Sequence, residues 1–102
     1  MEVVFRKKEY IIYHNIHDSN YIVYNTKKMW EEGHTHIHRL QQAHYLVDCC
    51  VKKKVPNKVN KYFLISLIRI SKDDKYKRLI QQKLDNFQIK QNYYNRPKNF
   101  RV

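Results

Sequence analysis

Three of the chain's six histidines stand at alternate positions in the stretch GHTHIHR, which covers residues 33–39: His34, His36 and His38, followed by Arg39. Imidazoles bind Zn, Ni or Cu, and with a pKa of ~6.5 they also serve as general base or acid. An arginine beside the free N–H groups of a helix start binds phosphate instead. The chemistry therefore depends on whether this stretch is a strand or the beginning of a helix.

We expect a helix here, with Gly33 in the preceding turn and Thr35 as its N-cap. His36 and His38 then lie in the first turn and point to different sides, so the histidines are first of all polar residues of a capped helix start. In second place, the free N–H groups of that start, with Arg39 one turn in, would accept a phosphate. The alternative is a strand, in which all three histidines share one face.

A metal site has little other support in the sequence. The chain contains no CxxC and no HExxH motif, and its only cysteines, Cys49 and Cys50, are neighbours. On a helix such neighbours diverge by about 100°. We therefore predict no metal and no cofactor. We also expect Cys50 to be packed, Cys49 to be more exposed, and His44 to be a core histidine with a hydrogen-bond partner.

A metal-independent ribonuclease remains a second hypothesis for the histidines. It would draw on His34, His36, His38, Arg39 and Tyr24, with histidines as base and acid and a cation for the developing negative charge. No nucleophile elbow, Walker loop or carboxylate pair accompanies them. The sequence leaves an enzyme open and favours a non-enzymatic protein.

The charge of the chain is strongly asymmetric. Residues 1–51 carry six basic and six acidic residues, whereas residues 52–102 carry 15 basic and three acidic ones, which gives the whole chain its net charge of +12. Such an excess indicates a polyanionic partner. RNA or single strands are favoured, because aromatic residues accompany the cations and no motif of a sequence-specific DNA reader occurs. The candidate nucleic-acid-binding residues are Lys52, Lys53, Lys54, Lys58, Lys61, Lys72, Lys75, Arg78, Tyr93, Tyr94, Arg96, Lys98 and Arg101.

The remaining pattern predicts an α+β fold. Residues 10–14 and 21–26 are runs of aromatic and β-branched residues around a turn-rich segment, which is typical of an antiparallel hairpin. Residues 3–6 could add a third strand. One face of the hairpin should meet the helices and the other should expose tyrosines, and an exposed strand edge could pair two copies of the chain.

Three helices should pack on this hairpin. Apolar periodicity predicts helices from Thr35 to about Lys53, over about 59–70, and from a capping box at Ser71 and Asp74 to about residue 88. We expect one domain over residues 1–89 and a flexible basic-aromatic tail over 90–102. No apolar run reaches the ~20 residues of a membrane span, and the start does not resemble a signal peptide. With no disulfide framework, a cytoplasmic protein is expected.

The stretches YIVYNTKKMWEEGHTHI and NKYFLISLIRISKDDKYKRLI resemble small proteins of low-GC Gram-positive bacteria and of their phages or mobile elements. The resemblance implies a context and no activity. Proteins of that origin include inhibitors of host nucleic-acid machinery. A phage or mobile-element inhibitor, of the anti-CRISPR kind, that docks on a host nuclease or ribonucleoprotein is therefore the alternative to a nucleic-acid-binding protein.

Overall fold

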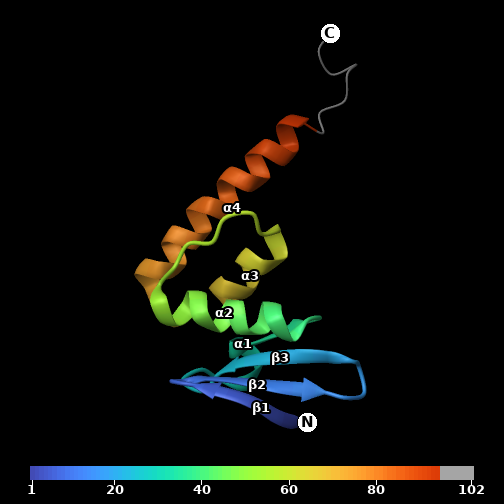
Figure 1. The fold of residues 1–102 in the computed structure, drawn as a ribbon. Coiled ribbons are helices and arrows are strands. Elements are labelled where there is room, and N and C mark those ends of the chain that lie inside the picture. The colour runs from blue at the N-terminus through green and yellow to red at the C-terminus, as the bar shows by residue number, and fades with distance from the viewer. Residues whose placement is uncertain (95–102) are drawn as a thin grey trace.

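A four-stranded sheet and three long helices form the structure, a computed structural model that describes the backbone of residues 1–94 and the side chains of residues 1–87. Helix α2 lies across one face of the sheet, α3 lies on α2, and α4 packs on α3 and extends away from the sheet (Figure 1). The elements run in the order β1 (Glu2–Lys7), β2 (Tyr10–Asn15), β3 (Asn20–Asn25), α1 (Trp30–Gly33), β4 (His34–Ile37), α2 (Leu40–Lys52), α3 (Lys61–Ile70) and α4 (Asp74–Tyr94). The predicted α+β class is confirmed.

The sheet is antiparallel throughout, in the order β1-β2-β3-β4. All three predicted strands are present. The expectation that one of the central hairpin strands offers a free edge is wrong, because β1 covers β2 and β4 covers β3. The edges of this sheet are β1 and β4.

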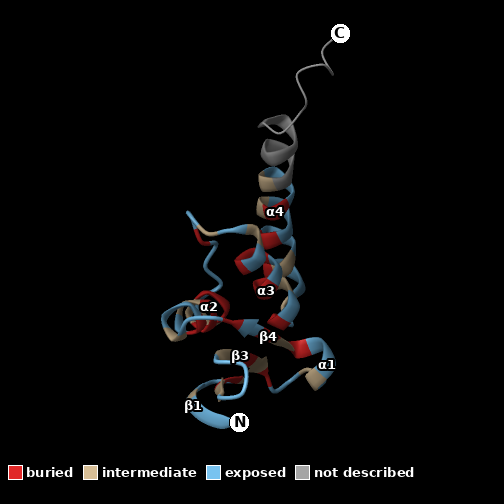
Figure 2. Ribbon diagram, turned by 90° about the vertical axis from the view of Figure 1, so that its right-hand side faces the viewer, coloured by how far each residue is buried: buried red, intermediate tan, exposed pale blue. Residues whose placement is uncertain are grey.

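The helix-facing side of the sheet carries Tyr10, Ile12, Val23 and Ile37, which are buried against the helices. These residues alternate with others along their strands, as one covered sheet face requires. Figure 2 shows the buried residues concentrated where α2 and α3 meet the sheet and where α4 begins. The core therefore lies between the sheet and the helices, and a second side of the sheet faces away from them.

The starts of α3 and α4 are set by polar caps. The side-chain oxygen of Asn60 accepts the N–H of Phe63 at 2.9 Å, so α3 begins at Lys61. At α4 the cap is Asp73, whose Oδ1 accepts the N–H of Tyr76 at 2.8 Å. The predicted capping box of Ser71 and Asp74 is replaced by this arrangement, in which Ser71 Oγ accepts the N–H of Asp73. Helix α4 also continues to Tyr94, beyond the predicted end near residue 88.

Two predictions about α2 are wrong. Cys49 is 0% exposed, because α2 is covered by α3 as well as by the sheet. His44 is exposed and lies outside the core, with its ring 4.4 Å from that of Phe5 on β1. A helix that packs on two sides buries more of its surface than the single apolar stripe of an amphipathic helix. In α2 the additional buried surface faces α3, and His44 lies outside it.

Candidate nucleic-acid interface

The end of α2 determines where its lysines lie. Lys53 has the left-handed backbone conformation (φ 56°, ψ 40°), and its N–H reaches the carbonyl of Cys49. This is a common way to end a helix, although glycine usually occupies the position. The chain then turns back along α4, where the hydroxyl of Tyr76 donates to the carbonyl of Lys54 at 2.6 Å. The Lys52–Lys54 run is thereby brought against the start of α4.

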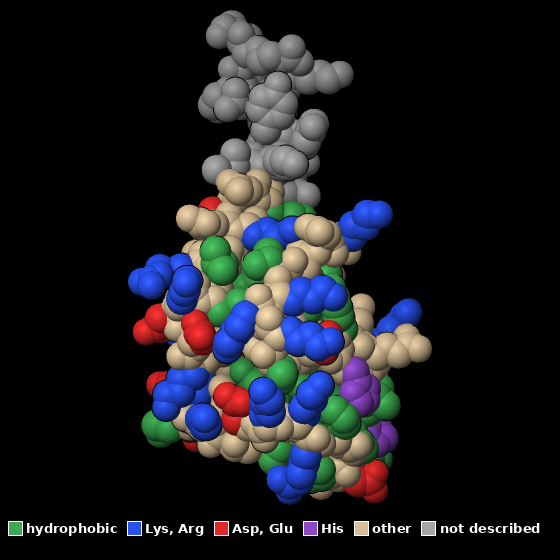
Figure 3. Space-filling model, turned by 60° about the vertical axis from the view of Figure 1, so that its left-hand side comes forward, with side chains coloured by type: hydrophobic (Ala, Val, Ile, Leu, Met, Phe, Trp, Pro, Cys, Tyr) green, Lys and Arg blue, Asp and Glu red, His purple; other side chains and the backbone are tan. Residues whose placement is uncertain are grey.

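Three of the predicted cations gather there: Lys53, Lys75 and Arg78, which we call the basic face. Lys53 and Lys75 line one shallow hollow together with Tyr76 and Leu79, and Arg78 follows Lys75 by one helical turn. All three are exposed. Figure 3 views the side of the molecule where α2 ends and α4 begins, and Lys and Arg side chains outnumber carboxylates on it.

The carboxylates on this side are already engaged. Lys53 Nζ lies 3.5 Å from Asp73, and Lys77 Nζ lies 3.7 Å from Asp74. The N–H of Tyr76, together with the charge of Lys53, lowers the pKa of Asp73. Asp73 therefore stays ionised and offsets part of the positive charge of Lys53, while Lys75 and Arg78 keep theirs.

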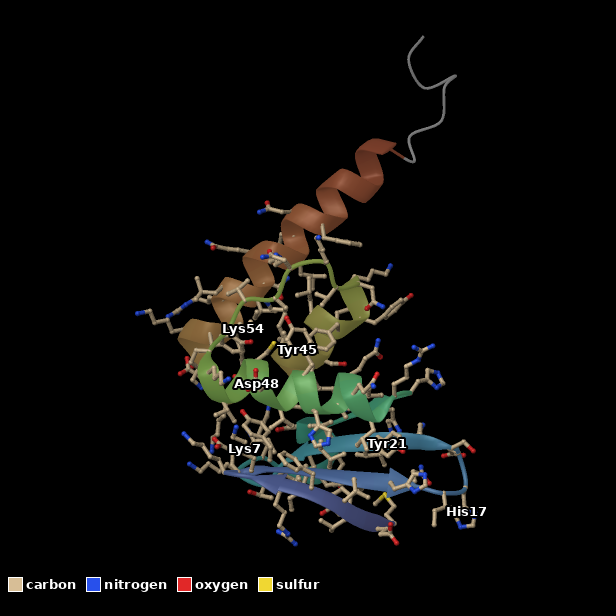
Figure 4. The ribbon with its side chains drawn as sticks, viewed as in Figure 1. Lys7, His17, Tyr21, Tyr45, Asp48 and Lys54 are labelled. Atoms are coloured by element: carbon tan, nitrogen blue, oxygen red, sulfur yellow. The ribbon has the colours of Figure 1, made fainter. Side chains whose placement is uncertain are left out.

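The other predicted cations are spread over the surface. Lys52 pairs with Asp48 at 3.1 Å, and Lys72 donates to the carbonyl of Lys27 at 3.1 Å. Lys54 Nζ lies 5.2 Å from the ring centre of Tyr45, and Figure 4 shows both on the same side of α2. Lys58 and Lys61 lie at the start of α3, away from the basic face. Tyr93 and Tyr94 end α4, where side chains are not described, and Arg96, Lys98 and Arg101 lie outside the described residues.

Two cations that the sequence analysis passed over have structural roles. Lys28 Nζ donates to the carbonyl of Arg69 at 2.7 Å, and burial together with the charge of Lys77 lowers the pKa of Lys28. The guanidinium of Arg69 donates to the carbonyls of His34 at 2.6 Å and Glu31 at 2.7 Å. These contacts fasten α1 and β4 to α3.

The histidine stretch is a strand, so the prediction that Thr35 caps a helix is wrong. Thr35 is buried, with its hydroxyl 2.7 Å from that of Ser66 on α3, and α2 begins only at Leu40. The β-branched and apolar residues Thr35 and Ile37 need burial on one side, which alternation provides and a first helical turn does not. His34 and His36 consequently share the other side, with ring centres 5.3 Å apart.

The ring of His34 packs against Trp30. The two rings stack with centres 4.4 Å apart, and Nδ1 of His34 faces the Trp30 carbonyl. Trp30 also contacts Tyr13 and Tyr24, so an aromatic cluster covers the side of the sheet away from the helices. Tyrosines lie on that side as expected, but Tyr13 and Tyr24 are half-buried and not exposed. The tight turn of α1 needs Gly33, since a Cβ there would lie 2.6 Å from Lys28 Cβ.

His38 instead lines a pocket of about 410 Å³ between β4, α2 and α3. We call it the β4–α2–α3 pocket. It is lined by His36, Ile37, His38, Gln42, Tyr45, Lys58, Val59, Asn60, Tyr62, Phe63 and Ser66. Of the predicted histidines, His38 lines this pocket together with Lys58, a predicted phosphate contact, whereas the ring of His36 lies beside that of His34 on the other side of β4. Sequence reasoning missed Gln42 and Tyr45 on α2 and Asn60 and Tyr62 at the start of α3, because only the packing of α2 against α3 brings the two pairs together.

Within residues 1–94, no three His, Cys, Asp or Glu side chains are grouped so that they could hold a metal ion. None of the helices in that part of the chain combines the length and the hydropathy needed to cross a bilayer. Comparisons of the chain with protein-family models, with curated proteins and with solved structures found no match.

Proposed function

We propose that this chain is a small, non-enzymatic, cytoplasmic protein that binds nucleic acid and prefers RNA or single strands. The observation that supports it most is the basic face: Lys53 and Lys75 side by side over one hollow, with Arg78 a turn along α4. Cations in a row track the phosphates of a strand, and binding releases the counterions that those phosphates hold.

The preference for unpaired strands follows from the aromatic residues near cations. Base faces stack on exposed rings while ammonium groups hold phosphates, a mode that suits RNA and single-stranded DNA better than duplex. Tyr62 is 67% exposed and has Lys61 Nζ 5.3 Å from its ring centre.

The test is fluorescence anisotropy with single-stranded RNA, single-stranded DNA and duplex DNA, each over a salt series. We expect the logarithm of the affinity to fall linearly with the logarithm of the salt concentration. Replacing Lys75 and Arg78 by alanine together should weaken binding and reduce the salt slope by about 1.5. The matched control replaces Arg6 and Lys8, which lie in the half of the chain with no net charge, and should leave slope and affinity nearly unchanged.

Weak binding to all three ligands at physiological salt would overturn the proposal. The positive charge would then serve an acidic protein surface, as in an inhibitor that docks where nucleic acid would pass on a nuclease or ribonucleoprotein. Loss of signal through cleavage of the labelled RNA, removed by alanine at His36 and His38, would support the ribonuclease hypothesis instead.

A further inference from the structure

We propose that the β4–α2–α3 pocket binds one unpaired nucleotide, whose phosphate lies at Lys58 and His38 and whose base lies against Tyr62. The inference rests on the nucleic-acid binding proposed above and assigns part of the recognition to a second place on the molecule. The ligand is a nucleoside monophosphate, whether free or as one unit of a strand.

The pocket has the size and depth of a small-molecule site. Its volume of about 410 Å³ falls within the range of roughly 300–1,000 Å³ that such sites occupy. Its floor includes Ser66, which is 7% exposed and is held by the contact between its hydroxyl and that of Thr35. The walls come from β4, α2 and α3 and from two connecting segments, one with His38 and one with Lys58 and Val59 that leads into α3.

One side of the pocket suits a phosphate. Lys58 and His38 are exposed and line it, and none of the pocket's lining residues is acidic. Lys58 has φ 57°, a backbone conformation that a lysine adopts only at an energetic cost.

The other side suits a base. Tyr62 is the most exposed aromatic residue of the lining, and Lys61 lies over one face of its ring. Tyr45 rises from α2 toward α3 (Figure 4), and its ring centre is 5.4 Å from that of Phe63. A base inserted at this wall meets a π-face, which every nucleobase accepts.

Amide groups between the two sides complete the site. The Oδ1 of Asn60 accepts the N–H of Phe63, which orients the side chain and leaves its NH₂ group as a donor. Gln42 is exposed at the same pocket and offers both a donor and an acceptor. An inorganic anion would contact only the cations of the lining. An acidic peptide would contact neither the ring face nor both amides. The lining as a whole therefore favours a nucleotide.

The first experiment is an NMR titration of the ¹⁵N-labelled full chain with uridine monophosphate, adenosine monophosphate and inorganic phosphate. We expect saturable shifts of the backbone amides of Gln42, Asn60 and Tyr62 with the nucleotides, at lower concentration than with phosphate. Equal response to phosphate alone, or no saturable response at millimolar nucleotide, would overturn the proposal.

The second experiment measures binding of a short single-stranded RNA by variants of the pocket. Tyr62→Ala should weaken binding about tenfold without changing the salt slope, because the variant loses the stacking contact with a base but keeps every charge. Tyr62→Phe should retain the affinity. Lys58→Ala should weaken binding and lower the salt slope by about 0.7. The matched control is Ile65→Ala, which removes an exposed side chain one turn along α3 that does not line the pocket.

The two proposals fail in different ways. If Tyr62→Ala and Lys58→Ala bind RNA as the wild type does, while the Lys75 and Arg78 variant is weakened, the pocket proposal fails and the basic face stands. If mononucleotides bind in the pocket while strands bind weakly, the pocket proposal holds for a free nucleotide and the proposed function fails.

Discussion

The side-chain amide of Asn25, at the end of β3, donates a hydrogen bond to the backbone carbonyl of Ile70, at the end of α3, over 2.8 Å. Asn25 is 0% exposed, and its Oδ1 accepts the N–H of Lys27. One buried side chain therefore satisfies two backbone groups, one two residues further along the chain and one 45 residues away. An unsatisfied buried group costs ~1–3 kcal/mol, so this contact fixes how α3 sits on the sheet.

We predict that Asn25→Asp lowers the free energy of unfolding by at least ~2 kcal/mol at neutral pH, because a buried carboxylate cannot donate to the Ile70 carbonyl. The loss should shrink below pH ~4, where a protonated carboxyl regains a donor. Urea unfolding at both pH values measures it. Thr26→Ala, which removes only an exposed hydrogen bond to Glu9, is the neighbouring control. Equal stability of Asn25→Asp and wild type would contradict the role given to this contact.

The guanidinium of Arg69, on α3, donates to two backbone carbonyls of the segment that contains α1 and β4. Its planar arrangement of N–H groups allows both hydrogen bonds at once. We predict that Arg69→Ala costs ~1–2 kcal/mol of unfolding free energy and that Arg69→Lys recovers little of it, because one ammonium group cannot replace the two-pronged contact. Denaturant titration gives the comparison. Arg78→Ala, an exposed arginine on α4, should change stability by no more than ~0.5 kcal/mol. Full rescue by lysine would show that charge alone matters at this position.

The stability of the protein should depend on Asp73 at low pH. The pKa of this carboxyl is lowered because it accepts the N–H of Tyr76 at the start of α4 and lies near Lys53. A lowered pKa means that Asp73 stabilises the fold above the ordinary carboxyl range and that the contribution is lost as pH falls through the folded value. We therefore expect wild type to lose more stability than Asp73→Asn between neutral pH and pH ~2, since asparagine still caps the helix. Parallel stability curves for the two proteins would contradict this.

The two cysteines should be unreactive in the folded protein. Cys49 and Cys50 are 0% and 1% exposed, and burial raises the pKa of both thiols, that of Cys50 to about 12. The reactive thiolate is thus scarce and shielded. We predict slow reaction with a disulfide reagent at pH ~8 in the native state and immediate reaction of both thiols in denaturant. A Ser19→Cys variant, with its thiol in an exposed turn, should react at once and serves as control. Fast titration of a native thiol would show that α2 opens locally.

Much of the architecture followed from local pattern. Runs of aromatic and β-branched residues predicted the strands at 10–14 and 21–26, because these side chains favour an extended backbone. Helical periodicity predicted α3 and α4, because it records which side of a helix must be buried. The division of the chain into a half without net charge and a basic half was also evident from the sequence, because charged residues can be counted without knowing the fold.

The tertiary structure decided the rest, and the histidine stretch is the clearest case. Thr35 is a good helix cap by type, yet its hydroxyl contacts Ser66, 31 residues further along the chain, and β4 completes the sheet beside β3. Propensity is local and weak, whereas sheet pairing and burial act between distant residues and outweigh it. The same long-range packing buried Cys49, exposed His44, put His34 and His36 on one side of β4, and placed His38 in one pocket with Lys58 and Tyr62.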